Sequence, residues 1–226
     1  MPRPQPAALL QDGLAAHRGG DLAKAEQCYR AALAADPQLD DAAHYLGVVA
    51  QQRGDLAGSV QLISSALARR PTATAWSNLA NALWLQGRLA EAEHACRQAL
   101  ALDPTCGPAL QNLGNVQKAA KRYDEAEATY DRALALSPGN PDLLSNLGVV
   151  LGALDRPDEA RTVFDQALAA RPDFPAALFN LANLETAFGD LETALAAYDR
   201  LLAAAPAHAD GHAARGAVLR RLGRGL

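Results

Sequence analysis

Large aromatic side chains are scarce in this chain. Phe, Trp and Tyr together make up 5% of its 226 residues, although hydrophobic residues make up 50%. Alanine raises the hydrophobic fraction, so we expect a core of small side chains that pack closely.

The chain also lacks the features of nucleic-acid, membrane and secreted proteins. Its net charge is −4 and its pI is near 5.7, whereas a nucleic-acid partner normally requires a strongly basic face. It has no run of about 18 apolar residues, the length that a transmembrane helix needs. The first six residues lack the apolar stretch of a secretory signal. We therefore expect a soluble protein that binds neither nucleic acid nor membrane.

Cysteine is rare and shows no paired spacing. Cys28, Cys96 and Cys106 are odd in number and are not arranged like metal ligands. Histidine offers no better metal site, because His208 and His212 lie four residues apart with no third ligand in view. The sequence predicts a cytoplasmic protein without a metal or a cofactor.

Proline, in contrast, recurs at a nearly constant spacing of 34, 33, 34, 34 and 34 residues, which indicates an array of repeats. The recurring residues are Pro37, Pro71, Pro104, Pro138, Pro172 and Pro206. With this proline at position 32, the predicted repeats are 6–39, 40–72, 73–106, 107–140, 141–174 and 175–208. A stub, 1–5, precedes them, and 209–226 is predicted to form a capping helix or a truncated seventh repeat. No remaining segment is long enough for a catalytic domain, so we do not expect an enzyme.

Each repeat contains two stretches with the apolar spacing of a helix, separated by a short break. The break often begins with glycine, which can end the first helix, and Asp21, Asp55 and Asp190 can cap the second. Position 8 is Gly or Ala, position 20 is Ala or Ser, and position 24 is mostly bulky. The small residues let the two helices approach, and the proline at position 32 ends the second helix. A single hairpin cannot bury its apolar surface, so neighbouring hairpins must stack.

This pattern resembles the tetratricopeptide repeat family, whose motif has Leu at position 7, Gly at 8, Ala at 20, an aromatic residue at 24, Ala at 27 and Pro at 32. The resemblance covers residues 6–208, although the first repeat carries Asp12 at position 7. It implies an all-α solenoid, a right-handed superhelix of six helical hairpins followed by a C-terminal helix. It also implies a concave groove lined by positions 2, 5, 6, 9, 12 and 13 of each first helix.

Asparagine forms a second periodic series on these groove positions. Position 6 is Asn in four consecutive repeats, and position 9 is Asn in three of them. An asparagine amide offers donors and an acceptor, which match the C=O and N–H of an extended peptide backbone. We therefore expect a peptide-binding groove with aromatic and cationic residues as further contacts. The predicted binding residues are Asn78, Asn81, Asn112, Asn115, Asn146, Asn180, Asn183, Trp84, Lys118 and Phe179.

The preferred function is a non-catalytic scaffold that recognises an extended segment of a partner protein, and three alternatives stay open. The asparagines can serve packing or solubility alone. The phrase Asn112-Leu-Gly-Asn is similar to the helical arm of O-linked N-acetylglucosamine transferases and related bacterial glycosyltransferases. That similarity implies a substrate-presenting arm whose catalytic domain lies elsewhere. The third alternative is a structural array that self-associates through its C-terminal helix.

Overall fold

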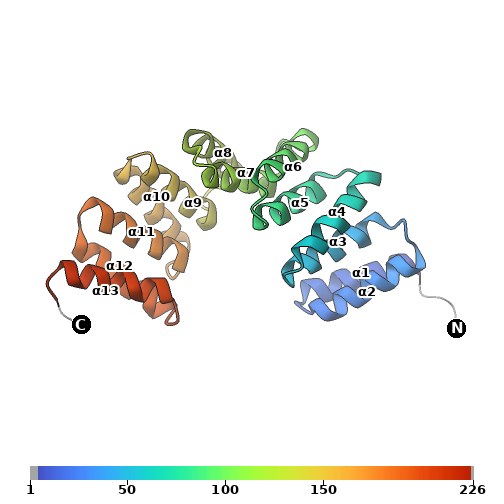
Figure 1. The fold of residues 1–226 in the computed structure, drawn as a ribbon, viewed down its shortest axis with the longest axis horizontal. Coiled ribbons are helices and arrows are strands. Elements are labelled where there is room, and N and C mark those ends of the chain that lie inside the picture. The colour runs from blue at the N-terminus through green and yellow to red at the C-terminus, as the bar shows by residue number, and fades with distance from the viewer. Residues whose placement is uncertain (1–4, 225–226) are drawn as a thin grey trace. The chain divides into compact units, whose positions relative to one another are not determined.

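The computed structural model describes residues 5–224, and all regular elements among them are α-helices (Figure 1). They are α1 (Pro6–Arg18), α2 (Leu22–Ala35), α3 (Asp40–Gln52), α4 (Leu56–Arg69), α5 (Ala73–Leu85), α6 (Leu89–Leu102), α7 (Gly107–Ala119), α8 (Tyr123–Leu136), α9 (Pro141–Ala153), α10 (Pro157–Ala170), α11 (Pro175–Phe188), α12 (Leu191–Ala204) and α13 (Ala209–Arg221). The prediction of an all-α array of helical hairpins is confirmed. Odd-numbered helices up to α11 are the first helices of the hairpins, and even-numbered helices are the second.

The chain divides into two compact bodies, which we describe separately. The N-terminal body, Met1–Val116, holds α1 to α6 and most of α7. The C-terminal body, Gln117–Leu226, holds the end of α7 and α8 to α13. Within each body the two helices of a hairpin pack together, and each second helix packs against the next first helix, as α4 does against α5 and α10 against α11. Successive first helices also touch, for example α3 with α5 and α9 with α11.

Local chemistry sets the helix boundaries. The carboxylates of Asp21, Asp55 and Asp190 each accept a hydrogen bond from the backbone N–H three residues later, at 2.8 to 3.1 Å. These are the predicted N-caps of α2, α4 and α12. Each second helix ends two residues before the recurring proline, because the residue before a proline avoids the helical conformation.

The break within each hairpin contains one residue with a left-handed backbone. In four hairpins this residue is glycine, which adopts a positive φ without steric cost. In the other two it is Lys121 or Asp155, each with a φ of 59°. A side chain at such a position costs about 1 to 2 kcal/mol, so these two breaks carry strain that the glycine breaks lack.

The close approach of the two helices depends on small residues at position 8, as the sequence predicts. A Cβ added to Gly148 would lie 2.6 Å from the ring of Phe164, and one added to Gly47 would lie 2.6 Å from Ile63. The position-24 residues that fill this space are Tyr29, Ile63, Cys96, Tyr130, Phe164 and Tyr198, all at most 1% exposed. Four of these six are aromatic rings, so the expectation of a core of small side chains is only partly right: small residues let the helices approach, and a row of mostly bulky residues is inserted between them.

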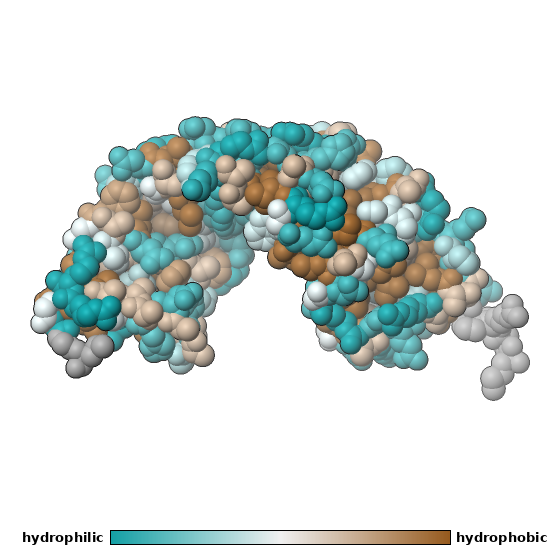
Figure 2. Space-filling view, viewed as in Figure 1, coloured by the Kyte–Doolittle hydropathy of each residue, from teal (hydrophilic) through white to brown (hydrophobic). Residues whose placement is uncertain are grey.

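The residues after the sixth hairpin form α13, which packs on α12. Arg215 pairs with Asp199 of α12 at 2.5 Å, and Arg221 donates to the carbonyl oxygen of Thr186 on α11 at 2.8 Å. The surface seen in Figure 2 mixes hydrophilic and hydrophobic residues, with hydrophobic residues gathered on the N-terminal body. Between residues 5 and 224, no helix combines the length and the apolar character needed to cross a membrane.

Candidate functional site

The ten predicted binding residues lie on the first helices of repeats 3 to 6. The N-terminal body carries Asn78, Asn81 and Trp84 on α5, and Asn112 and Asn115 on α7. The C-terminal body carries Lys118 at the end of α7, Asn146 on α9, and Phe179, Asn180 and Asn183 on α11. All are half-buried except Asn183, which is exposed. We call the surface formed in each body by positions 6, 9 and 12 of its first helices the first-helix face.

In the N-terminal body, the position-6 amides connect each first helix to the preceding one. The side-chain nitrogen of Asn78 on α5 lies 2.8 Å from Nε2 of His44 on α3. Because an amide nitrogen can only donate, Nε2 of His44 is the acceptor. Asn112 on α7 donates from Nδ2 to the carbonyl oxygen of Ser77 on α5 at 3.0 Å and to its hydroxyl at 3.2 Å.

The C-terminal body repeats this connection with one change. Asn180 on α11 donates from Nδ2 to the hydroxyl of Ser145 on α9 at 3.2 Å. At Asn146 the roles are reversed, because its carbonyl oxygen accepts from Nζ of Lys118 at 2.6 Å. Burial lowers the pKa of Lys118, whose ammonium group donates this hydrogen bond to a neutral amide oxygen rather than to a carboxylate. Each position-6 amide therefore has one end bound to the preceding first helix.

Three of the position-5 residues are buried, although the family resemblance implies that this position lines an open groove, whereas Gln111 and Phe179 at the same position are half-buried. His44, Ser77 and Ser145 at this position are 6%, 1% and 3% exposed. They lie beside the next first helix, whose position-6 amide bonds to them, and this inter-helix contact removes them from solvent. Burial also lowers the pKa of His44, which favours the neutral imidazole that can accept from Asn78.

The aromatic residues proposed as ligand contacts are partly held by the protein itself. Trp84 packs against the apolar core of the N-terminal body. The ring of Phe179 meets Tyr198 edge to face, with centroids 6.3 Å apart, and lies 5.0 Å from the His208 ring. The Tyr198 hydroxyl in turn donates to Oδ1 of Asn183 at 2.6 Å, which fixes the orientation of that exposed amide.

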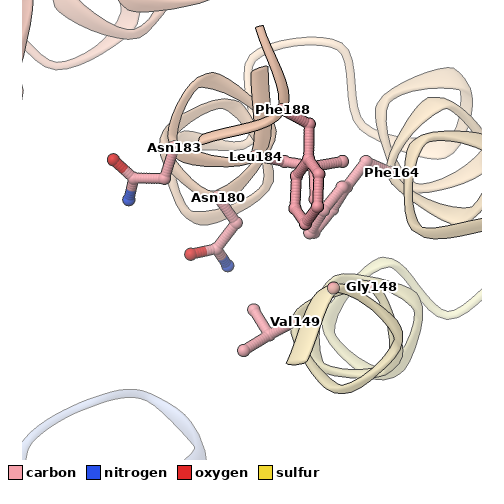
Figure 3. Close-up of a pocket in the computed structure, with 8 residues that line it drawn as sticks. Gly148, Val149, Phe164, Asn180, Asn183, Leu184 and Phe188 are labelled. Carbon is pink, nitrogen blue, oxygen red and sulfur yellow. The ribbon is translucent and has the colours of Figure 1, made fainter. Parts of the chain in front are cut away.

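A cavity of about 240 Å³ lies between α9 and α11 in the C-terminal body (Figure 3). Its lining residues are Gly148, Val149 and Gly152 of α9, Phe164 of α10, and Asn180, Asn183, Leu184 and Phe188 of α11. Figure 3 shows the amides of Asn180 and Asn183 projecting from one side of α11 and Phe188 projecting from another. We call this cavity the amide-flanked pocket, because its walls are apolar and two of the predicted binding amides stand at its border.

A second cavity, of about 350 Å³, lies among α4, α5 and α6 in the N-terminal body. Trp76, Leu79 and Leu83 contribute to its apolar wall, and the ion pair of Arg88 and Glu91 lies at its border with a nitrogen–oxygen distance of 2.6 Å. Trp76 is half-buried in this wall. None of the ten predicted binding residues lines it.

Sequence reasoning missed the apolar half of the amide-flanked pocket. Leu184 and Phe188 were not singled out, although Phe188 is 45% exposed. The signal that marks the pocket is Gly152 on α9, because position 12 carries a side chain in the neighbouring repeats and none here. Sequence reasoning also missed Glu185, whose buried carboxylate accepts from Nε of Arg161 at 2.6 Å.

The chemistry available on the first-helix face is hydrogen bonding by neutral amides together with apolar contact. Within residues 5–224 there is no group of three or more His, Cys, Asp or Glu residues that could hold a metal ion. Burial raises the pKa of the Cys96 thiol to about 12, so this cysteine remains a protonated core residue. Such a surface is suited to recognition.

Comparison with family models decides which family this is. Models described as tetratricopeptide repeat match residues 8–39, 71–139, 106–173 and 145–209, which is more than half of the chain. The chain belongs to the tetratricopeptide repeat family. Members of this family typically act as scaffolds that bind other proteins or peptides. The matched models describe the repeat alone, so the similarity to a glycosyltransferase arm stays a hypothesis. No curated protein matches the chain significantly.

Solved structures share the fold. A chain in the APC/C hetero-tetramer Cut9–Hcn1 has a TM-score of 0.87 at 18% identity, over 95% of this chain and 43% of that one. PilF of Pseudomonas aeruginosa has a TM-score of 0.78 at 24% identity, over 92% of this chain and 95% of that one. YrrB is described as a tetratricopeptide repeat protein with an unusual peptide-binding site. It has a TM-score of 0.57 at 26% identity, over 72% of this chain and 84% of that one. The chain thus spans less than half of the first of these relatives.

Proposed function

We propose that the first-helix face binds an extended segment of a partner protein through its asparagine amides, without catalysis. The observation that carries the proposal is the orientation of these amides. Asn112 and Asn180 donate from Nδ2 to the preceding first helix, so the Oδ1 atom of each is directed away from that bond. Throughout the described part of the chain, neither Oδ1 accepts a hydrogen bond, so both can accept from a backbone N–H.

Two other amides offer the opposite group. The Oδ1 atom of Asn146 accepts a hydrogen bond from Lys118, and that of Asn183 accepts one from Tyr198. The Nδ2 group of each amide therefore remains as the donor. An extended backbone carries both N–H and C=O groups, so a surface that binds it needs both acceptors and donors. The amides of the C-terminal body supply both.

The inward hydrogen bonds also reduce the cost of binding. An amide that is already held by the neighbouring helix loses little conformational freedom when a ligand arrives. Each amide–backbone bond contributes only about 0.5 to 1.5 kcal/mol, so affinity requires several of them at once. Lys118 is the one cation among the predicted binding residues, and it is bound to Asn146, which does not favour an acidic ligand. The likeness to YrrB, itself described as having a peptide-binding site, is consistent with this function.

A selection from random dodecapeptides displayed on phage, with the full chain as bait, tests the proposal. Peptides that are enriched are expected to bind at least about tenfold more weakly to Asn180→Ala/Asn183→Ala or to Asn81→Ala/Asn112→Ala. Circular dichroism establishes that each variant is folded.

The matched control is Gln61→Ala/Gln166→Ala, which removes two exposed amides from the second helices α4 and α10. This control is expected to bind the peptides as the wild type does. The proposal is wrong if no peptide is enriched, or if the glutamine and asparagine variants lose affinity equally.

A further inference from the structure

The amide-flanked pocket exists because α9 lacks a side chain at Gly152, where it faces α11. Gly152 occupies position 12 of this helix, one turn after Gly148, which packs against Phe164 of α10. In the neighbouring repeats, position 12 carries a side chain, Lys118 on α7 and Thr186 on α11. A Cβ added to Gly152 would lie 3.1 Å from Cδ1 of Leu184, so even one methyl group would begin to fill the space.

The walls of the pocket are apolar and partly open to solvent. Val149 of α9 and Leu184 of α11 contribute apolar walls, and the buried Phe164 adds the wall from α10. Phe188, at 45% exposure, is one of the few large hydrophobic residues that the described chain leaves exposed. A volume of about 240 Å³ lies below the usual range of about 300 to 1,000 Å³ for small-molecule sites. The size is suited to a single side chain.

The polar border of the pocket matches the backbone that would carry such a side chain. Asn180 donates to Ser145 and presents Oδ1, whereas Asn183 accepts from Tyr198 and presents Nδ2. Figure 3 shows the oxygen of Asn180 directed away from α9. The two amides therefore offer one acceptor and one donor beside the apolar walls. An extended residue has one N–H and one C=O, and its side chain stands roughly perpendicular to the backbone.

We infer that the amide-flanked pocket receives one aliphatic side chain of the bound segment, with Asn180 and Asn183 pairing with the backbone N–H and C=O beside it. This inference rests on the proposed function and adds a sequence preference to it. An aliphatic residue fits because no charged side chain lines the pocket. The neighbouring Glu185 is buried and already paired with Arg161.

The test uses the peptides selected from the random dodecapeptide library. We expect the enriched peptides to share one aliphatic residue, and its replacement by alanine to weaken binding at least about tenfold. The variant Gly152→Leu fills the pocket from α9 and replaces glycine by a better helix former, and circular dichroism establishes that it is folded. This variant is expected to bind the aliphatic peptides at least about tenfold more weakly than the wild type does. It is expected to bind their alanine-substituted forms as tightly as the wild type does.

The control is Ala153→Leu, which adds the same side chain at the next, exposed position of α9. It is expected to bind both kinds of peptide as the wild type does. If Gly152→Leu binds every peptide as tightly as the wild type while Asn180→Ala/Asn183→Ala loses them, the pocket inference is wrong and the proposed function stands. If no peptide responds to the amide variants, both are wrong. A wild-type dimer that Gly152→Leu abolishes would show that a second copy of the chain fills the pocket, which also overturns the inference.

Discussion

The ion pair between Arg161 and Glu185 predicts an unequal response to removal of its two members. Glu185 is 1% exposed, and its carboxylate accepts from Arg161 at 2.6 Å and 3.2 Å. The Arg161 side chain is 40% exposed and also pairs with Asp158 at 2.8 Å. The carboxylate is therefore the member that depends on its partner, whereas the guanidinium has other contacts.

Arg161→Ala leaves a buried carboxylate without its cation. Removal of one member of a buried pair lowers the free energy of unfolding by about 3 to 5 kcal/mol. Because water can enter where the exposed arginine stood, we expect a loss of about 2 to 3 kcal/mol here. Glu185→Leu puts an apolar residue of similar size into the same space, and we expect the free energy of unfolding to change by no more than about 1 kcal/mol. The double variant is expected to resemble Glu185→Leu, because the unpaired carboxylate is gone.

Urea unfolding followed by circular dichroism measures these differences, with the slope of the transition compared among variants to detect any loss of cooperativity. The reasoning is refuted if Arg161→Ala costs less than Glu185→Leu. It is also refuted if the double variant is as unstable as Arg161→Ala, because the loss would then come from the arginine and not from the stranded carboxylate.

Three further predictions concern stability. Burial lowers the pKa of His44 below its ordinary value of 6.5, so the unfolded chain binds a proton more readily and stability falls as the pH falls below 6.5. The free energy of unfolding, measured at several pH values, should depend less on pH in His44→Gln than in the wild type. An equal pH dependence would contradict this. Lys121→Gly and Asp155→Gly relieve a φ of 59° and are each expected to raise the free energy of unfolding by up to about 1 kcal/mol; a lower thermal midpoint would count against strain there. Ser59→Ala removes a buried hydroxyl that has no hydrogen-bond partner among residues 5–224, and it is expected to raise the free energy of unfolding in urea by about 1 kcal/mol. A decrease would indicate that the hydroxyl binds a water molecule.

The fold could be predicted from the sequence because its determinants are local and repeated. The recurring proline marks the end of each second helix, and residues such as Asp21 mark the start. Even the breaks without glycine, at Lys121 and Asp155, could be located from the period alone. Each repeat adds independent information on the same boundary, so one departure does not obscure the pattern.

The binding face could be predicted only in part. The period places the asparagines on the first helices, but the partner of Asn112, Ser77, lies 35 residues away and is defined only when the helices stack. The amide-flanked pocket depends on the missing side chain at Gly152 and on residues from three helices. Glu185 appears as one polar residue at an apolar position, and the structure is needed to show that Arg161 pairs with it.

The most direct test of the central claim, that the amides of the first-helix face bind a peptide backbone, is nuclear magnetic resonance of the asparagine side-chain amides. The ¹⁵N-labelled chain is titrated with a peptide selected from the dodecapeptide library. The account predicts that the side-chain NH₂ signals of Asn180 and Asn183 shift together and saturate at the affinity measured for the peptide. The signals of Gln61 and Gln166, on the second helices, are expected to stay in place. Saturable binding that moves the glutamine signals and leaves those of the asparagines unchanged would contradict the account.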